Sequence, residues 1–305
     1  MDYSTREKLD ELRWRTNQKG ENIVFYSYKM SEHDHINEHE FKRLKHSIAS
    51  LREFNNEISV YLFCDKPNLV PDHFKSEYSV LIRPFVKGFD HNMLSAWSIH
   101  RWYNLKYFRG KEHNILYLDS DTVFYSDVQY LFDTYCHLDV YGREEFGFRY
   151  DPNTGGGAKI RDQLDKVDEA IFDLGGQSEV YKYCLGVVLL NNNFHKYIIE
   201  KLDELTEMME LFKKSEILMP IPNPRIIDQY AVWVILSRIE VIGGLFAVQD
   251  VTMGYKEQKH KEFFNPVVLH YTTKGEQELA KEERFSNLRR DVDELAADID
   301  PYHVL

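Results

Sequence analysis

Cysteine is scarce in this sequence, and its few cysteines are widely separated. Cys64, Cys136 and Cys184 are the only three, and none belongs to a C-x-x-C pair. An odd number at such distances argues against a disulfide framework and against a zinc site built from thiolates. Sparse, unpaired cysteine is typical of reducing compartments, so we expect a cytoplasmic protein.

Long hydrophobic runs are missing as well. Apolar stretches such as 187–190 and 245–248 are far shorter than the roughly 20 residues that a membrane-spanning helix requires. Residues 1–15 are charged and lack the apolar centre of a signal peptide. We therefore expect neither a transmembrane segment nor a secretion signal.

Basic residues are outnumbered, since the 305-residue chain has 38 Lys and Arg against 50 Asp and Glu, a formal charge of −12. This balance argues against a nucleic-acid-binding protein, which needs a dense basic face. The charge does not exclude binding of small anionic ligands, because a bound cation or a few basic side chains at the site can reverse the local electrostatic field. The 43% of hydrophobic residues indicates a globular protein with a substantial core.

Short apolar segments alternate with longer amphipathic ones along the chain. The expected strands, all short and apolar, cover 23–28, 58–64, 79–84, 114–118, 185–191 and 267–270. Helical spacing of apolar residues predicts helices over 38–54, 92–108 and 228–238. This alternation predicts an α/β fold with a mostly parallel central sheet flanked by helices. Such sheets bind ligands beyond the carboxyl ends of their strands.

The sequence favours one domain over two, because no linker or repeat divides it. We expect this domain to cover residues 1–275, with its halves at about 22–130 and 131–275. Residues 276–305 are strongly charged and are expected to form a helical tail on the outside.

An acidic triplet follows the apolar strand that ends at Leu118. Asp119 and Asp121 flank Ser120, and side chains two residues apart point to the same side of an extended chain. The two carboxylates can therefore share a hard divalent cation such as Mg²⁺ or Mn²⁺. They can equally cap the next helix or form salt bridges, and the triplet alone leaves these alternatives open.

Residues 119–123, DSDTV, also satisfy the D-x-D-x-T/V pattern of haloacid dehalogenase-type phosphohydrolases. In those enzymes the first aspartate is a nucleophile, and the motif stands near the N-terminus with glycine after the second aspartate. Here 118 residues precede the motif, Thr122 replaces the glycine, and no G-D-x-x-x-D follows. We therefore rank this alternative low.

The motifs better resemble the nucleotide-diphosphosugar glycosyltransferases of the GT-A fold, particularly the glycogenin and bacterial galactosyltransferase group (family 8). The first strand with Ser27 and Tyr28 resembles the opening nucleotide-binding unit of that family. The other matches, in the family's order, are ILYLDSDTVFYSDVQYLF (115–132), YCLGVVLLNN (183–192), IDQYA (227–231) and LHYTTK (269–274). Cys184 and Leu185 depart from the family's asparagine and serine. The matches span residues 22 to 275 and imply the Rossmann-like GT-A fold.

The resemblance implies a divalent cation, Mn²⁺ or Mg²⁺, bound by Asp119, Asp121 and His270. Asp119 would also lie near the ribose, and Lys274 would meet the diphosphate as a point charge. A divalent cation neutralises the leaving diphosphate without proton transfer, which explains why such residues recur. Taken without the resemblance, His270 reads as a core histidine at a strand end.

The resemblance also implies residues for the nucleotide and the sugar. Asp228 and Gln229 would lie beside the transferred sugar and its anomeric carbon. The remaining donor-binding candidates are Ser27, Tyr28, Arg101, Ser120, Gly186 and Asn191. Lys106 is an alternative to Arg101, because the alignment of this helix with the family motif can shift by several residues. Asp228 also follows a proline-rich loop and can cap the helix that it begins.

The sequence thus predicts a metal-dependent glycosyltransferase that moves a sugar from a nucleotide sugar, by the resemblance a UDP-sugar, with retention. Front-face displacement and double displacement through Asp228 or Gln229 both remain open. The acceptor, whether a glycan, a lipid-linked sugar or a protein, is not readable from the sequence, and neither is the oligomeric state. A non-catalytic relative that binds sugar nucleotides is the main alternative.

Overall fold

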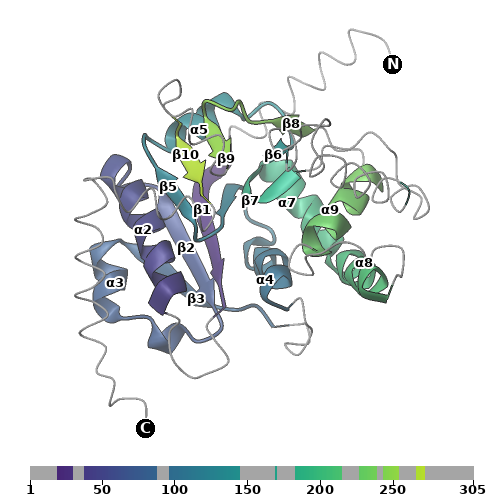
Figure 1. The fold of residues 1–305 in the computed structure, drawn as a ribbon, viewed down its shortest axis with the longest axis horizontal. Coiled ribbons are helices and arrows are strands. Elements are labelled where there is room, and N and C mark those ends of the chain that lie inside the picture. The colour runs from purple at the N-terminus through teal and green to yellow at the C-terminus, as the bar shows by residue number, and fades with distance from the viewer. Residues whose placement is uncertain are drawn as a thin grey trace, which may run out of the picture. The chain divides into compact units, whose positions relative to one another are not determined.

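A computed structural model describes residues 19–29, 38–87, 96–144, 169, 183–214, 227–238, 243–253 and 266–271 (Figure 1). The chain divides into two compact units, each built from three separate segments. The unit that contains the D-x-D motif, called the DxD unit here, comprises Asn22–Phe85, Leu116–Tyr135 and Phe246–Leu305. The other, called the α9 unit, comprises Met1–Glu21, Val86–Ile115 and Cys136–Leu245.

The DxD unit is built around parallel strands. These are β1 (Glu21–Tyr28), β2 (Ser59–Cys64) and β3 (Val80–Pro84), with β2 in the middle. The apolar side chains of β1 and most of those of β2 are buried, which is typical of parallel strands covered on both faces, whereas Leu81 in the edge strand β3 is exposed. The helix α2 (Glu38–Phe54) buries Phe41, Leu44, Ile48 and Leu51 along one face, as the apolar spacing predicts.

Two short helices and a small second sheet also belong to the described part of the DxD unit. The helices are α3 (Asp72–Glu77) and α5 (Gln129–Thr134), with a 3₁₀ turn at Pro67–Leu69. The second sheet has the order β5-β10-β9, with the strands β5 (Thr122–Phe124), β10 (Val268–His270) and β9 (Val251–Met253). In it His270 pairs with Thr122, so the sheet brings the end of β10 beside the D-x-D motif.

The described part of the α9 unit combines three strands with four longer helices. The strands are β6 (Val140–Glu144), β7 (Tyr183–Leu190) and β8 (Gly243–Leu245). Strand β6 runs antiparallel to β7 and parallel to β8. The helices are α4 (Ala96–Asn104), which continues as a 3₁₀ turn over Leu105–Phe108, α7 (Asn192–Glu200), α8 (Leu202–Lys214) and α9 (Ile227–Arg238).

Strand β4 (His113–Leu118) begins in the α9 unit and ends in the DxD unit. The seven-stranded sheet has the order β3-β2-β1-β4-β7-β6-β8 and is mostly parallel. The predicted α/β class, a mostly parallel sheet flanked by helices, is therefore confirmed (Figure 1). All six predicted strands are present within two residues of their expected ends.

Some predictions fall outside the described residues. Residues 92–95 of the helix predicted over 92–108 are among them, and so is the whole charged tail from 276 to 305. The division into one domain and a tail stays a prediction. None of the helices in the described part of the chain combines the length and the apolar character that crossing a bilayer requires.

Candidate metal centre

The D-x-D motif forms the turn between β4 and β5. Every residue of β4 is buried, whereas Asp119, Ser120 and Asp121 are half-buried, so the chain leaves the core where the apolar run ends. The Thr122 hydroxyl donates a hydrogen bond to the Asp119 carbonyl (3.0 Å) and closes the turn. The motif therefore stands at the carboxyl end of a central strand, as the sequence predicts.

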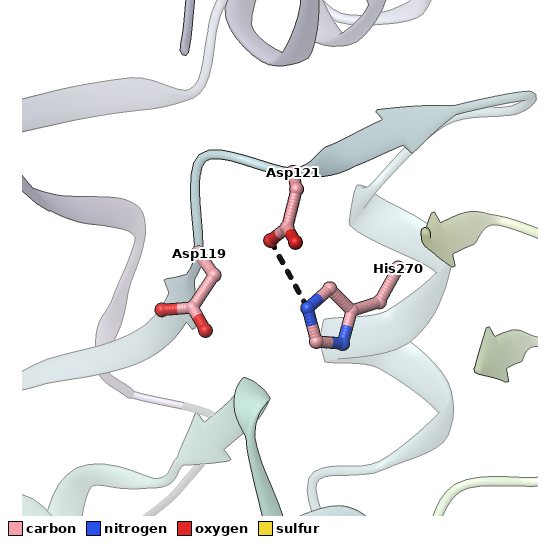
Figure 2. A group of neighbouring side chains, drawn as sticks. All are labelled: Asp119, Asp121 and His270. Atoms are coloured by element: carbon pink, nitrogen blue, oxygen red, sulfur yellow. Dashed lines mark hydrogen bonds and ion pairs between the residues drawn. The ribbon is translucent and has the colours of Figure 1, made fainter. Parts of the chain in front are cut away.

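His270 approaches this turn from the end of β10 (Figure 2). Its Nε2 atom lies 3.1 Å from Oδ1 of Asp121, and the Tyr271 N–H donates to the Asp121 carbonyl (2.9 Å). Ligand atoms of Asp119, Asp121 and His270 all lie within 4.8 Å of one another. The structure thus brings together the three residues predicted as metal ligands.

The electrostatics of Asp121 suit a cation. Burial alone raises the pKa of its carboxyl, but His270 and, more weakly, the charge of Arg43 on α2 outweigh burial, and the net pKa lies below the usual range. Asp121 is therefore ionised at neutral pH and presents a partly buried negative charge. The sequence did not predict that Arg43 acts on Asp121. The spacing of apolar residues in a helix does not indicate which strand end its charged residues approach.

The donor set fits a divalent transition metal. Carboxylate oxygens suit Mg²⁺ and Mn²⁺, whereas an imidazole nitrogen is a more usual ligand for transition metals than for Mg²⁺. Opposite ligands of an octahedral ion at about 2.1 Å are about 4.2 Å apart. The cluster, with its ligand atoms within 4.8 Å, is already close to that span. Between the two predicted ions, the mixed oxygen and nitrogen set favours Mn²⁺.

Hydroxyl groups hold the turn from inside the DxD unit. The Tyr117 phenol donates to Oδ1 of Asp119 (2.6 Å), and Ser47 on α2 hydrogen-bonds both to Thr122 (2.6 Å) and to Tyr26 (2.7 Å). Sequence reasoning missed Tyr117, although its position two residues before Asp119 puts both side chains on one side of the strand. That spacing is the signal that could have found it.

The predicted nucleotide-binding residues of β1 lie at its carboxyl end. Ser27 is half-buried, whereas Tyr28 is 5% exposed and packs its ring against Phe41 (6.2 Å between ring centroids). The Tyr28 ring is therefore part of the hydrophobic core. Contact of either residue with a nucleotide stays a prediction.

In the α9 unit, three predicted residues surround one stretch of β7. The Arg101 guanidinium donates to the Leu185 carbonyl (3.1 Å), and the Leu185 N–H donates to Oε1 of Gln229 (3.1 Å). Gly186, the next residue, is buried in the same strand. Arg101, Gly186 and Gln229 are thus close together within this unit.

The other predicted residues are less informative. Asp228 is the second residue of α9, and its side chain lies outside the described part, as does the whole of Lys274. Lys106, the competitor of Arg101, has its ammonium over the Tyr103 ring (4.5 Å to the centroid).

Asn191 is a residue of the α9 unit. It is the N-cap residue of α7, its side-chain amide donates to the Leu138 carbonyl, and the following residue, Asn192, donates its N–H to Asn114 Oδ1 (3.0 Å). Contact of Asn191 with a donor stays a prediction.

No protein-family model matches this sequence, and no curated protein matches it significantly. Solved structures do match. They include the galactosyltransferase LgtC in complex with donor and acceptor sugar analogs (TM-score 0.51, 12% identity, 82% of this chain and 86% of that chain). Mouse xyloside xylosyltransferase 1 (0.50, 12%, 83% and 98%) and the bifunctional glycosyltransferase WbbM (0.51, 14%, 83% and 46%) are others.

Identities this low establish the fold alone. Each of these proteins is a glycosyltransferase, and their folds cover more than four fifths of this chain. The chain therefore has the GT-A fold of the glycosyltransferases whose family 8 motifs its sequence resembles.

Proposed function

We propose that this chain is a glycosyltransferase that requires a divalent cation and transfers a sugar, with retention, from a UDP-sugar to an acceptor. The observation that carries the proposal is the convergence of Asp119, Asp121 and His270 at the carboxyl end of β4. In α/β sheets this is where ligands bind. The glycosyltransferase fold of the chain supports the same reading.

In the proposed site, Asp119, Asp121 and His270 would hold a Mn²⁺ ion. The bound cation would supply positive charge to the diphosphate as the bond to the sugar breaks. Asp121 suits this role because an aspartate carboxylate is ionised at neutral pH. Lys274 is proposed to add a second positive charge at the diphosphate.

The residues around Leu185 are proposed to face the sugar. Gln229 and Asp228 would lie beside the anomeric carbon, with Arg101 and Gly186 nearby. The hydrogen bond from the Leu185 N–H holds Oε1 of Gln229, so this amide has a defined orientation. A fixed orientation suits a side chain that must distinguish sugar hydroxyls. These roles rest on the family resemblance.

Ligand binding and donor hydrolysis test the proposal together. UDP with Mn²⁺ is expected to raise the unfolding temperature, since both bind only the folded state. Asp121→Asn should abolish that rise, because it removes the charge next to His270. Asp133→Asn is the matched control. It removes an exposed carboxylate of α5 that does not belong to the cluster of Asp119, Asp121 and His270. UDP release from a panel of UDP-sugars then measures transfer to water.

Three outcomes separate the alternatives. UDP release that needs Mn²⁺ and disappears in Asp121→Asn supports the proposal. Stabilisation by UDP without release from any UDP-sugar would indicate a non-catalytic nucleotide-sugar-binding protein. Hydrolysis of a generic phosphate ester that Asp119→Asn abolishes, without any effect of UDP, would indicate the phosphohydrolase instead. The acceptor, whether glycan, lipid-linked sugar or protein, is a subject for screening once a donor is known.

A further inference from the structure

Tyr117 holds the side chain of Asp119 from within the strand. Its phenol donates to Oδ1 of Asp119 at 2.6 Å, a short distance typical of a hydrogen bond to a charged oxygen. The Tyr117 ring is 5% exposed and packs against the fully buried ring of Phe25, with 5.4 Å between the ring centroids. The hydroxyl is therefore fixed in space by the core.

The main chain of Asp119 is held as well. Its carbonyl accepts the hydrogen bond from the Thr122 hydroxyl, which also contacts the buried Ser47 side chain. The residue is thus tied at two points, the carbonyl to the turn and the carboxylate to Tyr117. Fixing a carboxylate in advance spares the conformational entropy that ordering it on ligand binding would cost.

The chemical nature of the Tyr117 group matters at this position. A lysine or arginine there would also orient the carboxylate, but its positive charge would repel a bound cation. A neutral phenol orients the carboxylate and leaves its negative charge available. In contrast, the carboxylate of Asp121 contacts His270, which itself belongs to the cluster.

We infer that Tyr117 is a positioning residue that orients Asp119 toward the divalent cation of this site. The inference rests on the proposed function, because it assumes that a cation binds there. Outer-shell groups that orient metal ligands typically contribute 10- to 100-fold to metal affinity or activity. For one hydrogen bond to one of three ligands, we expect the lower end, about tenfold.

The test is Tyr117→Phe, which removes only the hydroxyl and keeps the ring against Phe25. Mn²⁺ affinity is measured in the presence of UDP from the electron paramagnetic resonance signal of free Mn²⁺. We expect the Kd for Mn²⁺ to rise about tenfold. The matched control is Tyr103→Phe, which removes a hydroxyl of similar burial that hydrogen-bonds to Thr206 (2.9 Å) in the α9 unit. This control should bind Mn²⁺ like the wild type.

Donor hydrolysis gives a second readout that a merely structural role would not move. In Tyr117→Phe, the Mn²⁺ concentration for half-maximal UDP release should rise by the same factor, whereas the rate at saturating Mn²⁺ should recover. The inference is wrong if Tyr117→Phe binds Mn²⁺ as tightly as the wild type and loses only as much thermal stability as Tyr103→Phe. That result would leave the proposed function intact. A rate loss that Mn²⁺ does not restore would also overturn the inference. Failure of the wild-type protein to bind Mn²⁺ with UDP would instead remove the proposed metal site, and this inference with it.

Discussion

Arg52, near the end of α2, donates hydrogen bonds to four main-chain carbonyl groups. The acceptors are Tyr78 (2.7 Å), Ile58 (2.9 Å), Asn55 (3.1 Å) and Ser79 (3.2 Å). Ser79 has a φ of 50°, a left-handed conformation that is costly for a residue with a side chain. A single planar guanidinium thus ties the end of α2 to the segments before β2 and β3.

Replacing Arg52 with methionine keeps an unbranched apolar stem like the aliphatic part of arginine and removes all of its donors. We expect the free energy of unfolding to fall by about 2 kcal/mol, because four carbonyl groups lose a charged partner and water replaces it only in part. Urea denaturation measures the change. Arg109→Met, at an exposed position, is the control and should stay within about 0.5 kcal/mol of the wild type. Equal stability of the two variants would contradict this assignment.

At the residue scale, the sequence predicted the cluster of Asp119, Asp121 and His270 because these residues stand in a local motif and at a strand end. Asp119 and Asp121 are two residues apart after an apolar run, and His270 follows another. Contacts between hydroxyl groups of different elements were not predictable in the same way. The bond of Ser47 to Thr122, for example, depends on where α2 packs, and no spacing along the chain encodes it.

At the scale of elements, the pairing of β6 with β7 requires a residue without a side chain at position 142. Gly142 lies in β6 opposite β7, and a Cβ atom placed on it would come within 2.6 Å of the Tyr183 ring. The ring is buried, and the Tyr183 carbonyl accepts a hydrogen bond from the Trp233 indole on α9 (2.9 Å). Tyr183 therefore cannot shift without disturbing the packing of that helix.

Gly142→Ala is expected to destabilise the protein by about 1–3 kcal/mol, the usual cost of overpacking a well-filled core. Thermal unfolding of the variant measures the loss. Combining it with Tyr183→Ala should give less than the sum of the single effects, because removing the ring removes the clash. Additive effects in this cycle would show that the glycine is needed for another reason.

The sequence predicted one long helix at its observed limits and the short strand β10, but it missed the helices α7 and α8 and three other short strands. The helix predicted over 38–54 has those limits in the structure, because its apolar face repeats over several turns. Strands β5, β8 and β9 have three residues each, too few for any periodicity to be visible. They exist because neighbouring strands supply their hydrogen-bond partners.

At the scale of the whole molecule, buried histidines couple stability to pH. His195 on α7 is fully buried, and burial, together with the charges of Lys196 and His113, lowers its pKa to about 4. Burial also lowers the pKa of His113. Because the unfolded histidine has a pKa near 6.5, the unfolded state binds more protons between about pH 6.5 and 4. Stability is therefore full above that window and falls as the pH falls through it.

His195→Gln should weaken this pH dependence. From the shift of His195 we expect the wild type to lose about 2 kcal/mol of stability between pH 7 and pH 5 through this residue, and the variant to be spared that loss. Urea denaturation at the two pH values measures the difference. His73→Gln, at an exposed position, should keep the wild-type pH dependence. An unchanged dependence in His195→Gln would show that other groups cause it.

The proposed metal centre joins residues that are 149 positions apart, with His270 arriving on the last described strand. His270 reaches Asp121 only when β10 pairs with β5. The ribosome therefore synthesises the D-x-D motif more than a hundred residues before the strand that carries His270. During synthesis the two aspartates of the motif are thus present long before the strand that brings His270 to them. A chain that stops short of β10 would have both aspartates and lack the third residue of the proposed metal centre.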